Sequence, residues 1–106
     1  MTDNETTIQT LKDAVGRFRT ERKWGRYHTP KNLSMSIAIE AAELMEHYQW
    51  MGGDPRETPF VGSYVPNELA DIAIYLLSFC DLHNVDLAAA IESKMHANAE
   101  KYPVNE

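Results

Sequence analysis

The chain has 106 residues, the usual length of one domain with a small hydrophobic core. With 43% hydrophobic and 25% charged residues, it has the composition of a globular protein rather than of a disordered chain. Its net charge of −6 and the lack of a basic segment argue against binding to a nucleic-acid polymer.

The N-terminal segment MTDNETT is polar, and no apolar run reaches the ~18 residues of a membrane span. We therefore expect a cytoplasmic protein with no membrane partner. The single cysteine, Cys80, excludes an internal disulfide and a cysteine-rich zinc site. It lies within an apolar run and is expected to be buried.

The first predicted helix covers residues 7–23 and ends near Gly25. Thr6 and Gln9 have the spacing of a capping box before it. Its apolar residues recur with the spacing of one helix face: Ile8, Leu11, Val15 and Phe18.

The second predicted helix follows a short loop that contains Trp24, Tyr27 and His28. Pro30 is expected to lie before this helix, with Asn32 as its N-terminal cap. The helix should extend to about residue 51. Its apolar residues cover more than one face, which indicates burial on several sides.

A segment rich in glycine and proline, residues 52–65, is predicted to be a long loop, and long loops often carry function. Pro66 suits the first position of a third helix, which should end near His83.

The fourth predicted helix begins after Asp86, its cap, and reaches about Tyr102, while Asn84 ends the helix before it. No segment has a strand pattern. The sequence thus predicts a single all-α, four-helix domain over residues 1–106.

Two pairs of carboxylates lie within the two most apolar predicted helices. Glu40 and Glu43 are three residues apart, as are Glu68 and Asp71, and this spacing places each pair on one helix face. If the two helices pack together, the four carboxylates converge, and their repulsion raises pKa values or requires a counter-ion. Oxygen ligands suit Mg²⁺ or Mn²⁺. A solvated acidic helix face is the structural alternative.

Other metal sites are not supported by the sequence. A di-iron bundle needs a glutamate three residues before a histidine, and none of the four histidines has one. No spacing of histidine and cysteine fits zinc. On the last predicted helix, Lys94, Asn98 and Lys101 share one face and suit a phosphate chain, with a solvated polar face as the alternative.

The chain resembles the all-α nucleoside triphosphate pyrophosphohydrolases of the MazG-like superfamily, and within it the small dCTP pyrophosphatase branch. The resemblance extends from about Leu11 to Pro103. The family's ExxE and ExxD motifs are EAAE at Glu40–Glu43 and ELAD at Glu68–Asp71. The flanks KNL and QW favour this branch over the phosphoribosyl-ATP pyrophosphohydrolases, which share the fold class. Further matching segments are ERKWGRYHTPKNL, ELMEHYQW, DIAIYLL and VDLAAAIESKMHANAEKYP.

The resemblance implies Mg²⁺-dependent hydrolysis of a nucleoside triphosphate to the monophosphate and pyrophosphate, in nucleotide-pool sanitation. It implies a pyrimidine nucleotide such as dCTP as substrate. Where the branch has a base-pocket histidine on its first helix, this chain has Val15, which weakens the expected preference for cytosine. The metal-binding and catalytic residues would be Glu40, Glu43, Glu68 and Asp71. The expected substrate-binding residues are Trp24, His28, Trp50, Tyr75, Lys94, Asn98, Lys101 and Tyr102. For His28, a hydrogen bond within its own loop is the alternative.

We expect Trp24 and Trp50 to sandwich the base, with a role as core or interface anchors as the alternative. Because the second and third helices have more apolar faces than one four-helix unit can cover, we also expect self-association. The resemblance suggests a dimer or a dimer of dimers, that is, a helical-bundle oligomer.

A non-catalytic all-α oligomeric interaction module is the alternative function. The two hypotheses differ in whether the four carboxylates face one cavity together with Lys94 and Asn98.

Overall fold

The computed structural model describes residues 1–54, 62 and 64–105. Every regular element within these ranges is helical, which confirms the predicted all-α class. The elements are α1 (Ile8–Glu21), a short 3-10 helix η1 (Gly25–Tyr27), α2 (Pro30–Glu46), α3 (Tyr64–Leu82) and α4 (Leu87–Lys101).

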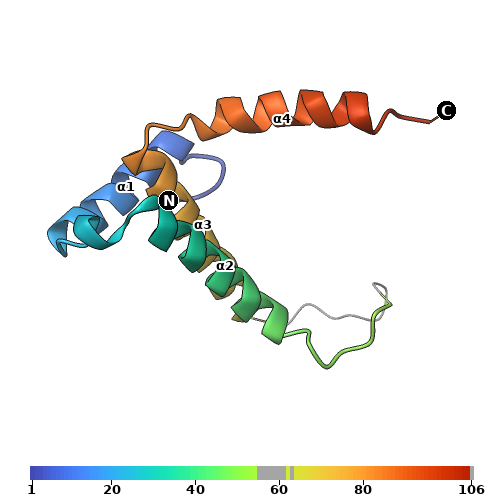
Figure 1. Cartoon of the computed structure of the whole chain (residues 1–106), viewed down its shortest axis with the longest axis horizontal. Coiled ribbons are helices and arrows are strands. Elements are labelled where there is room, and N and C mark those ends of the chain that lie inside the picture. Colours follow the sequence, from blue (N-terminus) through green and yellow to red (C-terminus); the bar gives the residue numbers. More distant parts are fainter. Residues whose placement is uncertain (55–61, 63, 106) are drawn as a thin grey trace.

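The helices α2 and α3 lie side by side, and α1 packs against α3 (Figure 1). Helix α4 extends away from this unit, bent by 105° from α3, and makes at most marginal contacts with the other described elements. No single described helix is long and apolar enough to cross a membrane, and α3 with α4 would reach that length only as this bent pair.

Two helices begin at caps that differ from the predicted ones. The side chain of Thr7, not Thr6, caps α1. Thr29 caps α2 by accepting the Asn32 N–H at 3.2 Å, so Pro30 is the first residue of the helix and Asn32 lies inside it. The first helical position suits proline because an N–H there would have no helical partner.

Helices α1 and α3 end in the same way. Lys23 and Asn84 adopt left-handed conformations, with φ of 57° and 56°. In each case the next N–H donates back to a carbonyl of the last turn, that of Arg19 or Cys80, at 3.1 and 3.0 Å. The predicted end at Asn84 is therefore confirmed, whereas α1 ends two residues before the predicted residue 23.

The remaining helix ends also differ slightly from the prediction. Helix α2 ends at Glu46 rather than near residue 51, and α3 begins at Tyr64 rather than at Pro66. Residues 55–61 and 63 of the predicted loop lie outside the described residues. Asp86 caps α4 as predicted, by accepting the Ala89 N–H at 3.0 Å.

The core of the described chain is small and partly polar. Leu33, Val65, Leu77 and Cys80 are its buried apolar residues. The side chain of Lys12 is also buried, and its Nζ donates to the Val85 carbonyl at 2.6 Å. This contact ties α1 to the end of α3, so the unit α1–α3 is held together by polar as well as apolar contacts.

Candidate metal and nucleotide site

The packing of α2 against α3 brings the predicted carboxylates together. Glu40 and Glu43 come from α2, Glu68 and Asp71 from α3. Oxygens of Glu40, Glu68 and Asp71 all lie within 4.8 Å of one another. Glu43 is close enough to Glu40 to share a hydrogen bond with it. We call these four residues the acidic cluster.

The acidic cluster repels itself. Burial raises the pKa of Glu40, and the hydrogen bond with Glu43 and the negative charges of Glu43, Asp71 and Glu68 raise it further. The Oε2 atoms of Glu40 and Glu68 are buried, and no described group donates a hydrogen bond to them. Buried carboxylate oxygens need a donor or a cation, and this donor set suits a hard divalent cation.

His47, which is not among the predicted site residues, contacts this cluster. Its Nε2 lies 3.2 Å from Oε1 of Glu68. Its ring also stacks on Tyr64, with centroids 5.6 Å apart and 23° between the planes. The spacing Glu40 to His47 is i, i+7, which places both on the same face of α2. That spacing is the signal that could have identified His47.

Four aromatic or imidazole rings contact one another in a row that ends near the acidic cluster. Phe18 meets Trp24 edge to face at 5.6 Å between centroids. Trp24 lies 6.3 Å from His28, which lies 6.3 Å from Tyr75. Tyr75 follows Asp71 by four residues on α3, so the row ends one helical turn from the cluster. We call Phe18, Trp24, His28 and Tyr75 the aromatic row.

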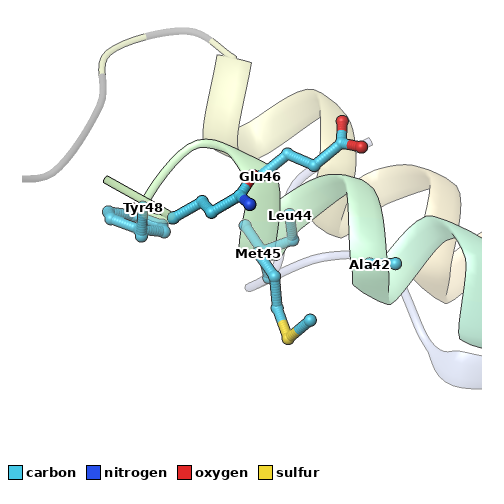
Figure 2. A pocket seen from close by; sticks show the side chains of 6 residues that line it. Ala42, Leu44, Met45, Glu46 and Tyr48 are labelled. Carbon is cyan, nitrogen blue, oxygen red and sulfur yellow. The ribbon is translucent and has the colours of Figure 1, made fainter. Parts of the chain in front are cut away.

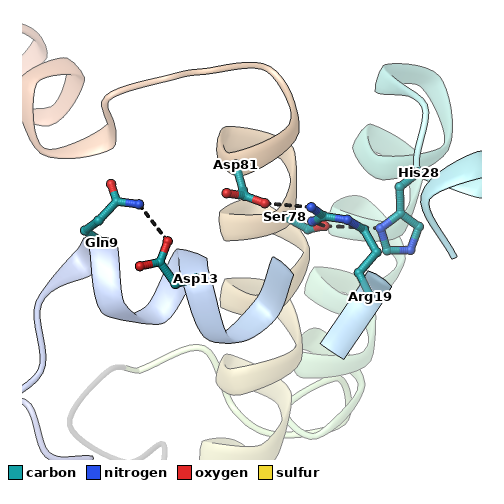
Figure 3. A network of polar contacts seen from close by, with 6 residues as sticks. All are labelled: Gln9, Asp13, Arg19, His28, Ser78 and Asp81. Carbon is teal, nitrogen blue, oxygen red and sulfur yellow. Dashed lines mark hydrogen bonds and ion pairs between the residues drawn. The ribbon is translucent and has the colours of Figure 1, made fainter. Parts of the chain in front are cut away.

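A buried polar network orients His28 (Figure 3). Nδ1 of His28 lies 3.1 Å from the Ser78 hydroxyl, which accepts a hydrogen bond from Arg19 at 2.8 Å. Arg19 pairs with Asp81 at 2.6 Å. Burial and then the positive charge of Arg19 lower the pKa of His28, so its imidazole is neutral near pH 7.

A glycine at the contact of α1 with α3 leaves room for the Asp81 carboxylate of this network. A Cβ at Gly16 would lie 2.9 Å from Oδ2 of Asp81. Gly16 therefore permits the close approach at which Arg19 reaches Asp81.

The predicted sandwich of one base by Trp24 and Trp50 does not form within a single chain. The two residues flank opposite ends of α2, whose 17 residues span about 25 Å. Trp50 is 89% exposed, and no described ring lies against it. A rigid helix of this length keeps the two indoles too far apart to share one base.

Within a single chain, the predicted phosphate-binding residues also lie away from the acidic cluster. Lys94, Asn98 and Lys101 are exposed on α4, and Tyr102 directly follows that helix. Because α4 turns away from α3 by 105°, these residues do not face the carboxylates of their own chain.

A hollow near the end of α2 does not coincide with the acidic cluster (Figure 2). It has a volume of about 720 Å³ and lies near the end of α2, where Met45 points outward from the helix. None of the four clustered carboxylates lines it. Its lining residues are Ala42, Leu44, Met45, Glu46, Tyr48 and Gln49.

Comparison with known proteins finds relatives over most of the chain. The profile of the MazG-like family matches residues 35–106. The dCTP pyrophosphatase 1 of Rattus norvegicus is 33% identical over 105 residues, and that of Homo sapiens is 33% identical over 109 residues. Each match covers 95% of this chain, which spans only 62% of the length of these curated relatives.

A solved structure extends the comparison to the fold. The crystal structure of a pyrophosphatase from Archaeoglobus fulgidus is 38% identical to this chain, with a TM-score of 0.85. The match covers 98% of this chain and 99% of that one. Together with the family match, this similarity shows that the chain belongs to the MazG-like family.

Proposed function

We propose that the chain is a Mg²⁺-dependent nucleoside triphosphate pyrophosphohydrolase that acts on a pyrimidine nucleotide such as dCTP, in nucleotide-pool sanitation. The observation that carries this proposal is the convergence of Glu40, Glu68 and Asp71 on one point between α2 and α3. The dCTP pyrophosphatases and the archaeal pyrophosphatase to which the chain is similar support the reaction type.

The acidic cluster would hold the metal. Glu40 and Glu68 each have a buried oxygen without a hydrogen-bond donor among the described residues. Glu43 and Asp71 are exposed, so they lie where a triphosphate can approach from solvent. When bound, Mg²⁺, or Mn²⁺ in its place, neutralises phosphate charge and polarises the phosphoryl oxygens. Without such a cation, the cluster would repel a triphosphate.

The aromatic row is the proposed base site. It ends at Tyr75, one turn from Asp71, so a nucleotide with its phosphates at the acidic cluster can place its base against these rings. His28 is held by Ser78 through Nδ1, which leaves Nε2 for a contact with base or sugar. Stacking on Trp24 would contribute about 1–3 kcal/mol.

A second copy of the chain would complete the site. The exposed surface of 8472 Å² is about 2,400 Å² more than a compact monomer of 12.1 kDa is expected to expose. Much of α4 contributes to this surface, since all its residues from Ala88 to Lys101 are exposed. An isolated helix of 15 residues is only marginally stable in water, so α4 needs a packing partner.

Apolar and charged groups both favour this self-association. Ile91 and Met95 of α4 are 49% and 64% exposed, and Met35 and Ile39 of α2 are 51% and 55% exposed. Burying these faces against each other in a dimer or a dimer of dimers removes apolar surface from water. The same contact would bring the cations of α4 toward the partner's carboxylates, where Lys94, Asn98, Lys101 and Tyr102 would bind phosphate and sugar. Trp50 would then lie near an interface.

A substrate panel tests this function. The full chain is incubated with the common ribo- and deoxyribonucleoside triphosphates and Mg²⁺, and pyrophosphate and monophosphate are quantified. We expect equimolar pyrophosphate and monophosphate from a pyrimidine nucleotide, released about 100-fold or more slowly by the Glu43→Gln variant.

Two results would contradict the proposal. A preference for purines would overturn the assignment of the base site. A folded protein that binds neither Mg²⁺ nor Mn²⁺ and hydrolyses no nucleotide would instead support the non-catalytic interaction module.

A further inference from the structure

His47 is the histidine that reaches the acidic cluster in the described part of the chain. It is the C-terminal cap of α2, and its Nε2 lies 3.2 Å from Oε1 of Glu68. The two side chains are 24% and 18% exposed, so water has little access to the contact. A carboxylate only accepts hydrogen bonds, and Nε2 of His47 is therefore the donor.

The imidazole ring of His47 is itself held in place. It stacks on Tyr64, the first residue of α3, with centroids 5.6 Å apart and 23° between the planes. The ring therefore lies between the end of α2 and the start of α3. Stacking restricts its rotation and keeps Nε2 directed at Glu68.

This contact gives the two carboxylate oxygens of Glu68 different surroundings. Oε1 accepts from His47, whereas Oε2 is buried and has no described donor. A carboxylate fixed at one oxygen presents the other in a defined direction, and ligand groups in metal sites are commonly oriented by such outer contacts. Oε2 is then the oxygen available to face Glu40 and Asp71.

We propose that His47 is a positioning residue of the acidic cluster: its imidazole N–H holds Oε1 of Glu68 and directs Oε2 toward the oxygens of Glu40 and Asp71. The inference rests on the proposed function, because it assumes that this cluster binds a divalent cation. It assigns His47 no contact with the nucleotide.

Calorimetric titration of Mn²⁺ into the nucleotide-free full chain tests this role. We expect His47→Ala to weaken Mn²⁺ binding about tenfold or more. His47→Gln retains an N–H donor of similar reach and should lose less. His83→Ala is the matched control, because His83 lies against the Phe79 ring and contacts no described carboxylate.

Thermal melts distinguish positioning from a purely structural role. A structural role would lower Tm equally with and without Mn²⁺ and leave the Kd for Mn²⁺ unchanged. Positioning instead shrinks the rise in Tm that Mn²⁺ produces. If His47→Ala does not fold, Tyr64→Ala makes the same test by removing the stacking partner, with Tyr64→Phe as its control.

The outcomes separate this inference from the proposed function. A wild-type protein that binds Mn²⁺ and a His47→Ala protein that binds it equally well would overturn the role of His47 alone. A wild-type protein that binds no Mn²⁺ would overturn both proposals.

Discussion

Glu40 of α2 and Asp71 of α3 meet across the helix interface, with carboxylate oxygens within 4.8 Å of each other. Two negative charges at this separation destabilise each other, and Glu68 adds a third within the same distance. The packing of α2 on α3 therefore has an electrostatic cost that a divalent cation would remove.

Neutralising one acid of the cluster should affect activity and stability in opposite directions. We expect Glu43→Gln or Asp71→Asn to lower kcat about 100-fold or more, because metal-assisted stabilisation of the transition state is worth several kcal/mol. Without metal, the variants should be as stable as the wild type or slightly more stable. Mg²⁺ should raise the Tm of the wild type and raise that of the variants less, since it binds only the folded site.

Asp13→Asn is the control for this prediction, because Asp13 is exposed and accepts a hydrogen bond from Gln9 on α1. If Mg²⁺ shifts no melting temperature and the cluster variants retain activity, the carboxylates form only a solvated face.

The raised pKa of Glu40 predicts how metal-free stability depends on pH. Above pH 4.5, the ordinary value, the unfolded chain releases this proton while the folded chain still holds it. The free energy of unfolding in EDTA should therefore fall as the pH rises, until folded Glu40 is also ionised. Glu40→Gln should flatten this slope in urea titrations, and an unchanged slope would argue against the repulsive cluster.

The lowered pKa of His28 contributes a pH dependence of the opposite sign, which begins at pH 6.5 and extends to lower pH. Its pKa is lowered from 6.5, so the unfolded chain binds a proton first, and stability is lost as the pH falls below that value. His28→Gln should remove this loss and leave the contribution of Glu40. Comparing His28→Gln with Glu40→Gln therefore measures separately what each group adds to the pH dependence of the free energy of unfolding.

A site completed by a second copy predicts complementation between inactive variants. Glu43→Gln lacks one acid, and Lys94→Ala lacks a cation of α4. If α4 acts on the partner's cluster, mixed dimers contain one intact site, and equal mixing should restore about a quarter of wild-type activity. Each variant alone should remain inactive, and pyrophosphate release before and after mixing is the measurement.

Sedimentation provides the independent check on assembly. A stable monomer of 12.1 kDa at micromolar concentration would contradict self-association. A dimer without complementation would show that α4 acts within its own chain or has no part in the site.

Removing the central indole of the aromatic row should weaken nucleotide binding. We expect Trp24→Ala to raise KM about fivefold or more and to change kcat less, because stacking on a base contributes about 1–3 kcal/mol. Tyr27→Ala is the control, since Tyr27 is 54% exposed and contacts Arg26 rather than the row. Steady-state kinetics with the preferred nucleotide is the measurement, and an unchanged KM in Trp24→Ala would remove Trp24 from the base site.

The ion pair between Arg19 and Asp81 should stabilise the folded chain. Asp81→Asn leaves a buried guanidinium without its charged partner, and we expect a loss of about 2 kcal/mol because Asp81 is partly exposed. Glu21→Gln is the matched control, because its pair with Arg22 is exposed and such pairs contribute about 0–1 kcal/mol. Urea unfolding of the two variants compares the pairs directly, and equal losses would contradict a special role for Arg19.

Local features of this protein could be predicted from its sequence alone. The helical periodicity and the end of α3 at Asn84 depend on interactions within a few residues, and so does the cap at Asp86. The ExxE and ExxD spacing likewise places each pair of acids on one helix face. Thr6 is one residue and Asn32 three residues from the observed caps, Thr7 and Thr29. Competing caps within one turn differ little in free energy, and this is why Thr6 and Asn32 were wrong choices.

Contacts between distant residues were decided only by the tertiary structure. His47 and Glu68 are 21 positions apart, and Arg19 and Asp81 are 62 apart, so no local pattern relates them. The separation of Trp24 from Trp50 by the length of α2 and the turn of α4 away from the acidic cluster also depend on how whole helices are arranged. Periodicity identifies the apolar face of a helix, but the surface that covers that face is selected by the packing of complete elements against one another.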